Sequence, residues 1–141
     1  MKQKDERIKS IWDAYQYLFY RIYIWQLYLF GKDDVPEFTA LVGNSVLLGF
    51  NLLTLVTVYQ VVAGHTFRID YEYPILGVLL IYLVNYFLLI RGNKTQAIVD
   101  RFSSEGEGQR KRRLVYCLGY VVLTFLTFFI SVALSPNARW W

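Results

Sequence analysis

Cysteine and histidine are almost absent from this sequence of 141 residues, which contains one of each. The single cysteine, Cys117, has no partner in the chain for a disulfide bond, and a lone Cys offers no zinc site. The stretches 38–63, 75–90 and 114–134 also lack every Asp, Glu, Lys, Arg and His. Catalysis within them would need a nucleophile, metal ligands or an acid–base pair. We therefore predict that the protein is not an enzyme and holds no metal or cofactor.

The uncharged stretches are long and apolar, in a chain that is 55% hydrophobic. A helix rises about 1.5 Å per residue and the hydrocarbon layer is about 30 Å thick, so about 20 apolar residues cross it. The sequence thus predicts an all-α membrane protein with three transmembrane helices, at about 38–63, 72–91 and 114–134. The middle helix reaches past its uncharged residues because tyrosines tolerate the interface and Arg91 can extend its charge to the surface.

Residues 4–30 form a different kind of segment, rich in tyrosine and tryptophan. Apolar side chains recur at helical spacing from Ile8 to Leu29, and Asp13 and Gln16 lie on the other side. As a span, this helix would bury Arg21 near the bilayer centre at a cost of about 2.5–3.5 kcal/mol. We predict an amphipathic interfacial helix within residues 1–37, followed by a transmembrane domain over 38–141. The alternative is a helix packed by its aromatic residues into the cytoplasmic mouth of the bundle.

The positions of Lys and Arg indicate the topology, because these residues resist translocation. Thirteen of the 15 lie before the first span or between the second and third, and only Arg68 and Arg139 lie elsewhere. We therefore expect the N-terminus and the basic loop 91–113 inside a bacterial inner (cytoplasmic) membrane, and the C-terminus outside.

The basic loop ends in a run of four cations, Arg110, Lys111, Arg112 and Arg113. Such a cluster, where the third span enters the membrane, is expected to bind anionic lipid. Each charge contributes a binding free energy of about 1 kcal/mol. An anionic ligand such as a nucleotide or nucleic acid is the weaker alternative, because no recognition motif accompanies the charges.

Polar residues also occur inside the predicted spans. Asn44 and Asn51 lie seven residues apart and so share one face of the first span. Ser45 and Gly49 lie on a second face, with the small-residue spacing that allows close helix packing. The middle span contains one amide, Asn85.

The third span contains a stripe of polar side chains at helical spacing, Cys117, Tyr120, Thr124, Thr127, Ser131 and Ser135. Two interpretations fit these groups and the amides. They can join helices through hydrogen bonds, or bond their own backbone. Alternatively, they line a polar path through the membrane, which needs several copies of a three-helix chain. The candidate pore-lining or interhelix residues are Asn44, Asn51, Asn85, Thr124, Thr127 and Ser131.

The polar stripes exceed what one small bundle needs, so we predict a homo-oligomeric ion channel or pore-type membrane effector, of a toxin-like or defence kind. The alternative is a non-conducting membrane subunit, an anchor or regulator that docks a cytoplasmic or membrane protein partner through residues 8–30. The layout resembles that of small uncharacterised three-span inner-membrane proteins of bacteria. This resemblance rests on the aromatic first helix and the basic second loop, and it implies no activity.

Overall fold

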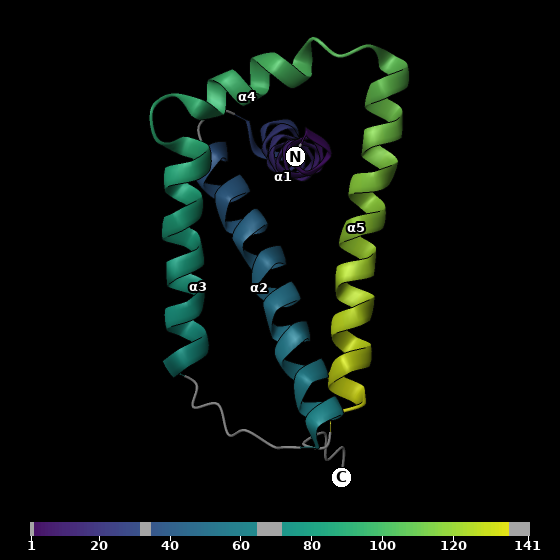
Figure 1. Ribbon diagram of the computed structural model, residues 1–141. Helices are drawn as coiled ribbons and strands as arrows, with labels where there is room; N and C mark the ends of the chain where they lie inside the picture. The colour runs from purple at the N-terminus through teal and green to yellow at the C-terminus, as the bar shows by residue number, and fades with distance from the viewer. Residues whose placement is uncertain (1, 32–34, 65–71, 136–141) are drawn as a thin grey trace.

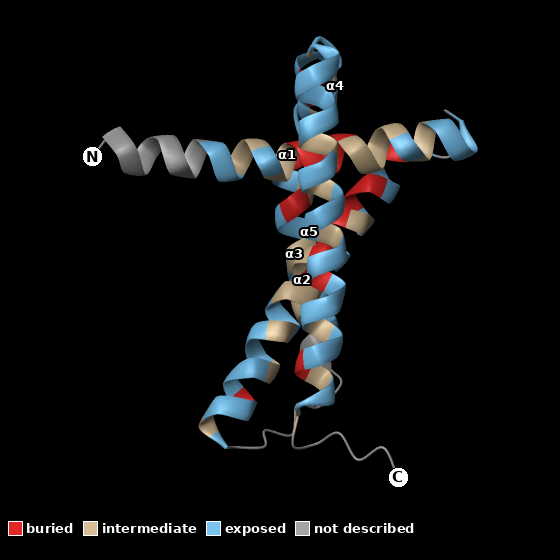
Figure 2. Cartoon of the chain, turned by 90° about the vertical axis from the view of Figure 1, so that its right-hand side faces the viewer, coloured by how far each residue is buried: buried red, intermediate tan, exposed pale blue. Residues whose placement is uncertain are grey.

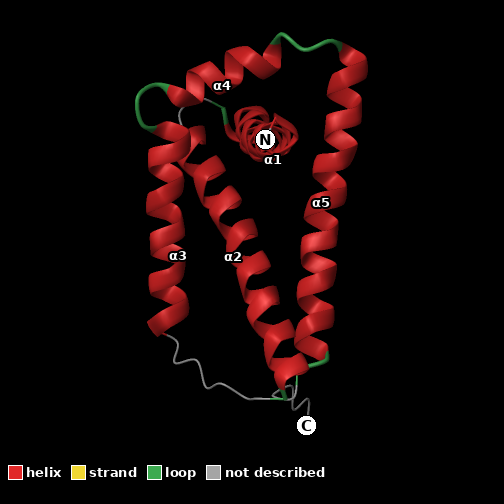
Figure 3. Cartoon of the chain, viewed as in Figure 1, coloured by secondary structure: helices red, strands yellow, loops and turns green. Residues whose placement is uncertain are grey.

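The computed structural model describes residues 2–31, 35–64 and 72–135, with side chains from residue 10 in the first helix and from residue 75 in the third. The described residues are almost all helical and contain no strand (Figure 3). In chain order the elements are α1 (Lys2–Phe30), α2 (Pro36–Ala63), α3 (Glu72–Asn85), the π-helical segment η1 (Tyr86–Ile90), α4 (Lys94–Ser103) and α5 (Glu107–Ala133). The predicted all-helical class is thus confirmed for this part of the chain.

Two of these helices meet the requirements for crossing a membrane on their own. α2 and α5 have 28 and 27 residues, with mean hydropathies of 1.9 and 2.1 over their most apolar windows. Residues 75–90 and α4 qualify only as a pair, which is bent by 63° between them. By length and composition, the described residues contain two helices that could cross a membrane, or three if the bent pair counts as one, which supports the predicted class of helical membrane protein.

The bend follows from the backbone after η1. Gly92 and Asn93 have φ angles of +78° and +59°, in the left-handed region that glycine and asparagine tolerate best. Consecutive left-handed residues cannot continue a right-handed helix, so the chain turns before α4 begins at Lys94.

Residues 91–113, the basic loop between the second and third predicted spans, are largely helical. They contain α4 and the first two turns of α5, which begins at Glu107, before the predicted span 114–134. Arginine and lysine favour helices. The cations at residues 110–113 therefore lie within α5, before its apolar part begins. The helices are interrupted between α4 and α5 only at residues 104–106.

The helices of the described residues do not share one direction. α2, α3 and α5 run roughly along one axis, and α1 crosses them nearly at right angles (Figures 1 and 2). α1 passes between α2 and α5 at the end where these helices spread apart, and α4 lies across the same end (Figure 1). At the opposite end α2 and α5 come together. The core lies around α1 and comprises Tyr17, Phe19, Tyr20, Ala40, Leu41, Leu89, Ile98 and Phe102.

Candidate functional site: the transverse helix and its polar contacts

The centre of α1 is enclosed on all sides. Residues Tyr17–Tyr20 are each at most 5% exposed. Four consecutive helical residues point in directions about 100° apart, so their common burial surrounds the helix. An amphipathic helix lying on a membrane would bury one face only. The middle of α1 is therefore packed among the other helices by its aromatic residues.

α4 covers α1 from the outer side of this crossing. Phe102 of α4 packs edge-on against Tyr17, with ring centroids 5.2 Å apart, and lies 5.6 Å from the ring of Tyr20. Ile98, one turn earlier on α4, is buried in the same cluster. The apolar face of α4 thus packs onto the aromatic side chains of α1.

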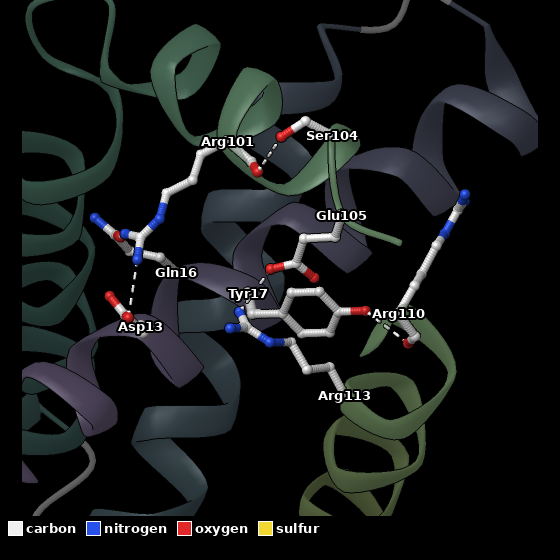
Figure 4. Close-up of polar contacts among 8 residues, drawn as sticks. All are labelled: Asp13, Gln16, Tyr17, Arg101, Ser104, Glu105, Arg110 and Arg113. Carbon is white, nitrogen blue, oxygen red and sulfur yellow. Dashed lines mark hydrogen bonds and ion pairs between the residues drawn. The ribbon is translucent and has the colours of Figure 1, made fainter. Parts of the chain in front are cut away.

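An ion pair joins α4 to α1, and an arginine of α5 packs on an aromatic ring of α1 (Figure 4). Arg101 of α4 lies 2.8 Å from the carboxylate of Asp13 on α1. At the start of α5, Arg113 pairs with Glu105 at 3.0 Å, and its guanidinium lies 5.6 Å from the ring centroid of Tyr17. These contacts connect both ends of the α4–α5 turn to the transverse helix.

The basic cluster is divided by this arrangement. Arg113 is partly buried in its pair with Glu105, whereas Arg110, Lys111 and Arg112 are exposed. The carbonyl of Arg110 accepts a hydrogen bond from the hydroxyl of Tyr17 at 3.2 Å. Three of the four cations predicted to bind anionic lipid or ligand are therefore free to do so, while Arg113 is engaged within the chain.

A first buried polar contact joins three helices. The hydroxyl of Tyr15 on α1 donates to Oδ1 of Asn85 on α3 at 2.7 Å, and Nδ2 of Asn85 donates to Oγ of Ser45 on α2 at 2.9 Å. Burial raises the pKa of Tyr15 above its ordinary value. Asn85 and Ser45 thus act together at the crossing of α1, α2 and α3.

A second polar contact joins α2 and α5. Nδ2 of Asn51 donates to the hydroxyl of Tyr120 at 2.6 Å and to the carbonyl of Leu47 in its own helix at 3.0 Å. The hydroxyl of Thr124, which is buried, lies 3.5 Å from Oδ1 of Asn51. Two of the predicted residues, Asn51 and Thr124, are therefore brought together across a helix interface.

Other hydroxyls of the spans bond their own helices. Thr127 donates to the carbonyl of Leu123 at 2.8 Å, and Ser131 donates to that of Phe128 at 2.8 Å. Thr54 and Thr57 of α2 do the same with carbonyls four residues earlier. In this conformation each of these hydroxyls has its hydrogen-bond partner within its own helix.

Asn44 differs from the other amides. It is fully buried at 0% exposure, and neither its Oδ1 nor its Nδ2 has a hydrogen-bond partner among the described residues. Although it shares a helix face with Asn51, it does not join the α2–α5 contact. A buried amide without a partner is costly and rare in proteins, so this position is unusual.

Among the glycines of α2, Gly43 lies nearest to a side chain of another helix. A Cβ added to Gly43 would lie 3.3 Å from two side-chain carbons of Ile22 on α1, whereas one added to Gly49 would meet Val78 of α3 only at 4.0 Å. Gly43 therefore permits the crossing of α1 over α2. Sequence analysis missed it, and it also missed Tyr15 as a polar partner, since nothing in the pattern separates Tyr15 from the other tyrosines of α1.

Comparisons with known proteins give no further assignment. No protein-family model matches the sequence, and no curated protein and no solved structure matches the chain. In the described part of the chain, no group of three or more His, Cys, Asp or Glu residues is placed to hold a metal ion.

Proposed function

We propose that the protein is a non-conducting membrane subunit, an anchor or regulator that presents a fixed transverse helix to a partner protein. The observation that carries the proposal is the placement of α1. Its centre is enclosed at Tyr17–Tyr20, while Trp25, Tyr28, Leu29 and Phe30 at its far end are exposed, Tyr28 to 85%. A helix held this firmly, with an aromatic end left open, suits docking better than conduction.

The use of the polar groups supports the same conclusion. The amides of Asn51 and Asn85 form hydrogen bonds between helices. The hydroxyls of Thr127 and Ser131 donate to carbonyls of their own helix. A channel lining requires polar groups directed at a shared axis. In the chain described here, these groups are directed at neighbouring helices or at their own.

The membrane placement is part of the proposal. α2, α3 with η1, and α5 span a bacterial inner membrane, with α1, α4 and the basic start of α5 on the cytoplasmic side and the C-terminus outside. The distribution of Lys and Arg supports this orientation, and α1 and α4 do lie at the same end of the molecule (Figure 1).

The homo-oligomeric channel is the second candidate, favoured by one observation. Both amide atoms of Asn44 are buried without a partner in the described residues, and a polar path formed by several copies would satisfy them after rearrangement. This candidate requires α1 to move from between α2 and α5, because α1 fills the space where these helices spread apart.

Reconstitution distinguishes the two candidates. Purified protein is placed in liposomes loaded with an ion-sensitive dye, and flux is compared with protein-free liposomes. We expect no added flux. An ion flux above that of protein-free liposomes, which changes in an Asn44→Leu variant, would establish the channel instead.

Site-specific photocrosslinking tests the docking role. A photoreactive amino acid at Tyr28, at the open end of α1, is compared with one at Tyr116, which is also exposed but lies on α5. In the native host we expect one discrete protein adduct from position 28 and none from position 116. Equal labelling from both positions, or adducts of position 28 with this chain alone, would contradict the subunit function.

A further inference from the structure

A groove of about 360 Å³ lies where α1 crosses α2 and α3. Seven residues line it: Ile11, Trp12, Tyr15, Leu48, Val84, Asn85 and Leu88. Its polar groups already have partners, because the Tyr15 hydroxyl donates to Asn85 and the Asn85 amide donates to Ser45. The groove therefore offers a mainly apolar surface, beneath α1 and beside the spans.

A cation lies just beyond one end of the groove. Arg91 caps η1 and comes three residues after Leu88, which lines the groove. The Arg91 side chain is exposed, and its guanidinium lies 5.0 Å from the ring centroid of Phe87.

No acidic side chain described in the structure lines the groove to neutralise this cation. Asp13 is next to Trp12 in sequence, but its carboxylate is paired with Arg101 at 2.8 Å. An apolar groove that ends at an exposed arginine is complementary to a molecule with an apolar tail and an anionic head. A phospholipid of the cytoplasmic leaflet has this form.

We propose that the groove holds one acyl chain of an anionic phospholipid whose phosphate pairs with Arg91. The groove alone cannot select a lipid, because acyl chains elsewhere in the bilayer are equally apolar surroundings. Selection comes from the charge of Arg91, near the membrane surface, where one cation changes the binding of an anionic lipid by about fivefold. This inference shares with the proposed function only the placement of α2, α3 and α5 in a bilayer.

Trp12 provides a reporter inside the groove. Trp25, Trp140 and Trp141 are replaced by Phe, and the protein is reconstituted in mixtures of phosphatidylglycerol and phosphatidylcholine in which one lipid carries brominated, fluorescence-quenching acyl chains. We expect brominated phosphatidylglycerol to quench Trp12 with a relative binding constant of about five over phosphatidylcholine. A matched protein that keeps only Trp25, which is exposed on α1 away from the groove, should show a constant near one.

Two pairs of variants test the site itself. Arg91→Gln should bring the Trp12 constant to about one, whereas Arg112→Gln, in the exposed basic cluster, should leave it unchanged. Val84→Phe should fill the groove and reduce quenching by both lipids, whereas Leu83→Phe on the lipid-exposed surface of α3 should not. Size-exclusion profiles and helical content equal to those of the parent protein establish that each variant is folded.

Three results would overturn the proposal. The first is equal quenching of Trp12 by the two brominated lipids in the parent protein, and the second is an unchanged preference in Arg91→Gln. The third is displacement of the lipid preference by soluble glycerol 3-phosphate, which would assign the arginine to a free phosphate rather than to a lipid. None of these outcomes depends on whether a protein partner binds α1.

Discussion

Tyr15 and Asn85, 70 residues apart in sequence, are joined by a hydrogen bond of 2.7 Å from the tyrosine hydroxyl to the amide oxygen. This bond connects the transverse helix α1 to α3. The amide nitrogen of Asn85 in turn donates a hydrogen bond to Ser45 of α2. One buried amide therefore fixes the relative positions of three helices.

Tyr15→Phe should destabilise the protein. The substitution leaves the buried Oδ1 of Asn85 without its donor, which costs about 1–3 kcal/mol in buried sites, although hydrogen bonds between membrane helices average about 0.6 kcal/mol. We expect a loss of about 1 kcal/mol in unfolding by SDS titration in mixed micelles. Tyr116→Phe, which changes an exposed tyrosine of α5, is the control, and an equal loss there would refute the role assigned to Tyr15.

Asn51→Leu should weaken the contact between α2 and α5. It removes the 2.6 Å hydrogen bond to Tyr120 and the weaker approach of Thr124. We expect a loss of about 0.6–1.5 kcal/mol in the same titration. Thr127→Val should change stability by less than about 0.5 kcal/mol, because that hydroxyl bonds its own helix. The reverse order of the two effects would show that Thr127, not Asn51, joins helices.

Gly43→Val should disrupt the crossing of α1 over α2. A Cβ at this position already lies 3.3 Å from Ile22, so the added methyl groups overpack the contact at a cost of about 1–3 kcal/mol. Gly119→Val is the matched control, since a Cβ at Gly119 meets no atom within 4 Å. Replacing Ile22 by Ala in the Gly43→Val protein should recover part of the loss, and no recovery would mean that the strain lies elsewhere.

Arg113→Gln should loosen the turn between α4 and α5 more than Asp13→Asn does. Arg113 pairs with the mostly buried Glu105 and covers aromatic rings, so its loss leaves a buried carboxylate unpaired, at about 1–3 kcal/mol. The pair of Asp13 and Arg101 is more exposed and is expected to contribute about 0.2–1 kcal/mol. Trypsin cleavage after residues 110–112 should accelerate in Arg113→Gln, and equal acceleration in Asp13→Asn would contradict this ranking.

Much of the helical arrangement could be predicted from the sequence because it depends on local properties. The uncharged stretches predicted apolar helices, and α2 covers the first of them from Pro36 to Ala63. The start of α5 was harder to predict from the sequence, because the cations of residues 110–113 are compatible with either a loop or a helix. α5 begins at Glu107, and Arg113 in its second turn pairs with Glu105, just before the helix.

The position of α1 depends on contacts that no local pattern encodes. Its periodicity predicted one buried face, whereas the four residues Tyr17–Tyr20 are buried together by three different helices. The polar residues of the spans show the same limit. Helical spacing placed Asn44 and Asn51 on one face, but it could not predict that Asn51 meets Tyr120 while Asn44 is enclosed without a partner.

The enclosure of α1 also has a consequence for biosynthesis. α1 is made first, yet the carbonyl that receives the hydroxyl of Tyr17 belongs to Arg110, 93 residues later. The enclosure of α1 is thus complete only after α5 has left the ribosome. Until then the aromatic residues of α1 have no enclosed site, so final assembly must wait for α5, and truncation before α5 should leave α1 exposed to proteases.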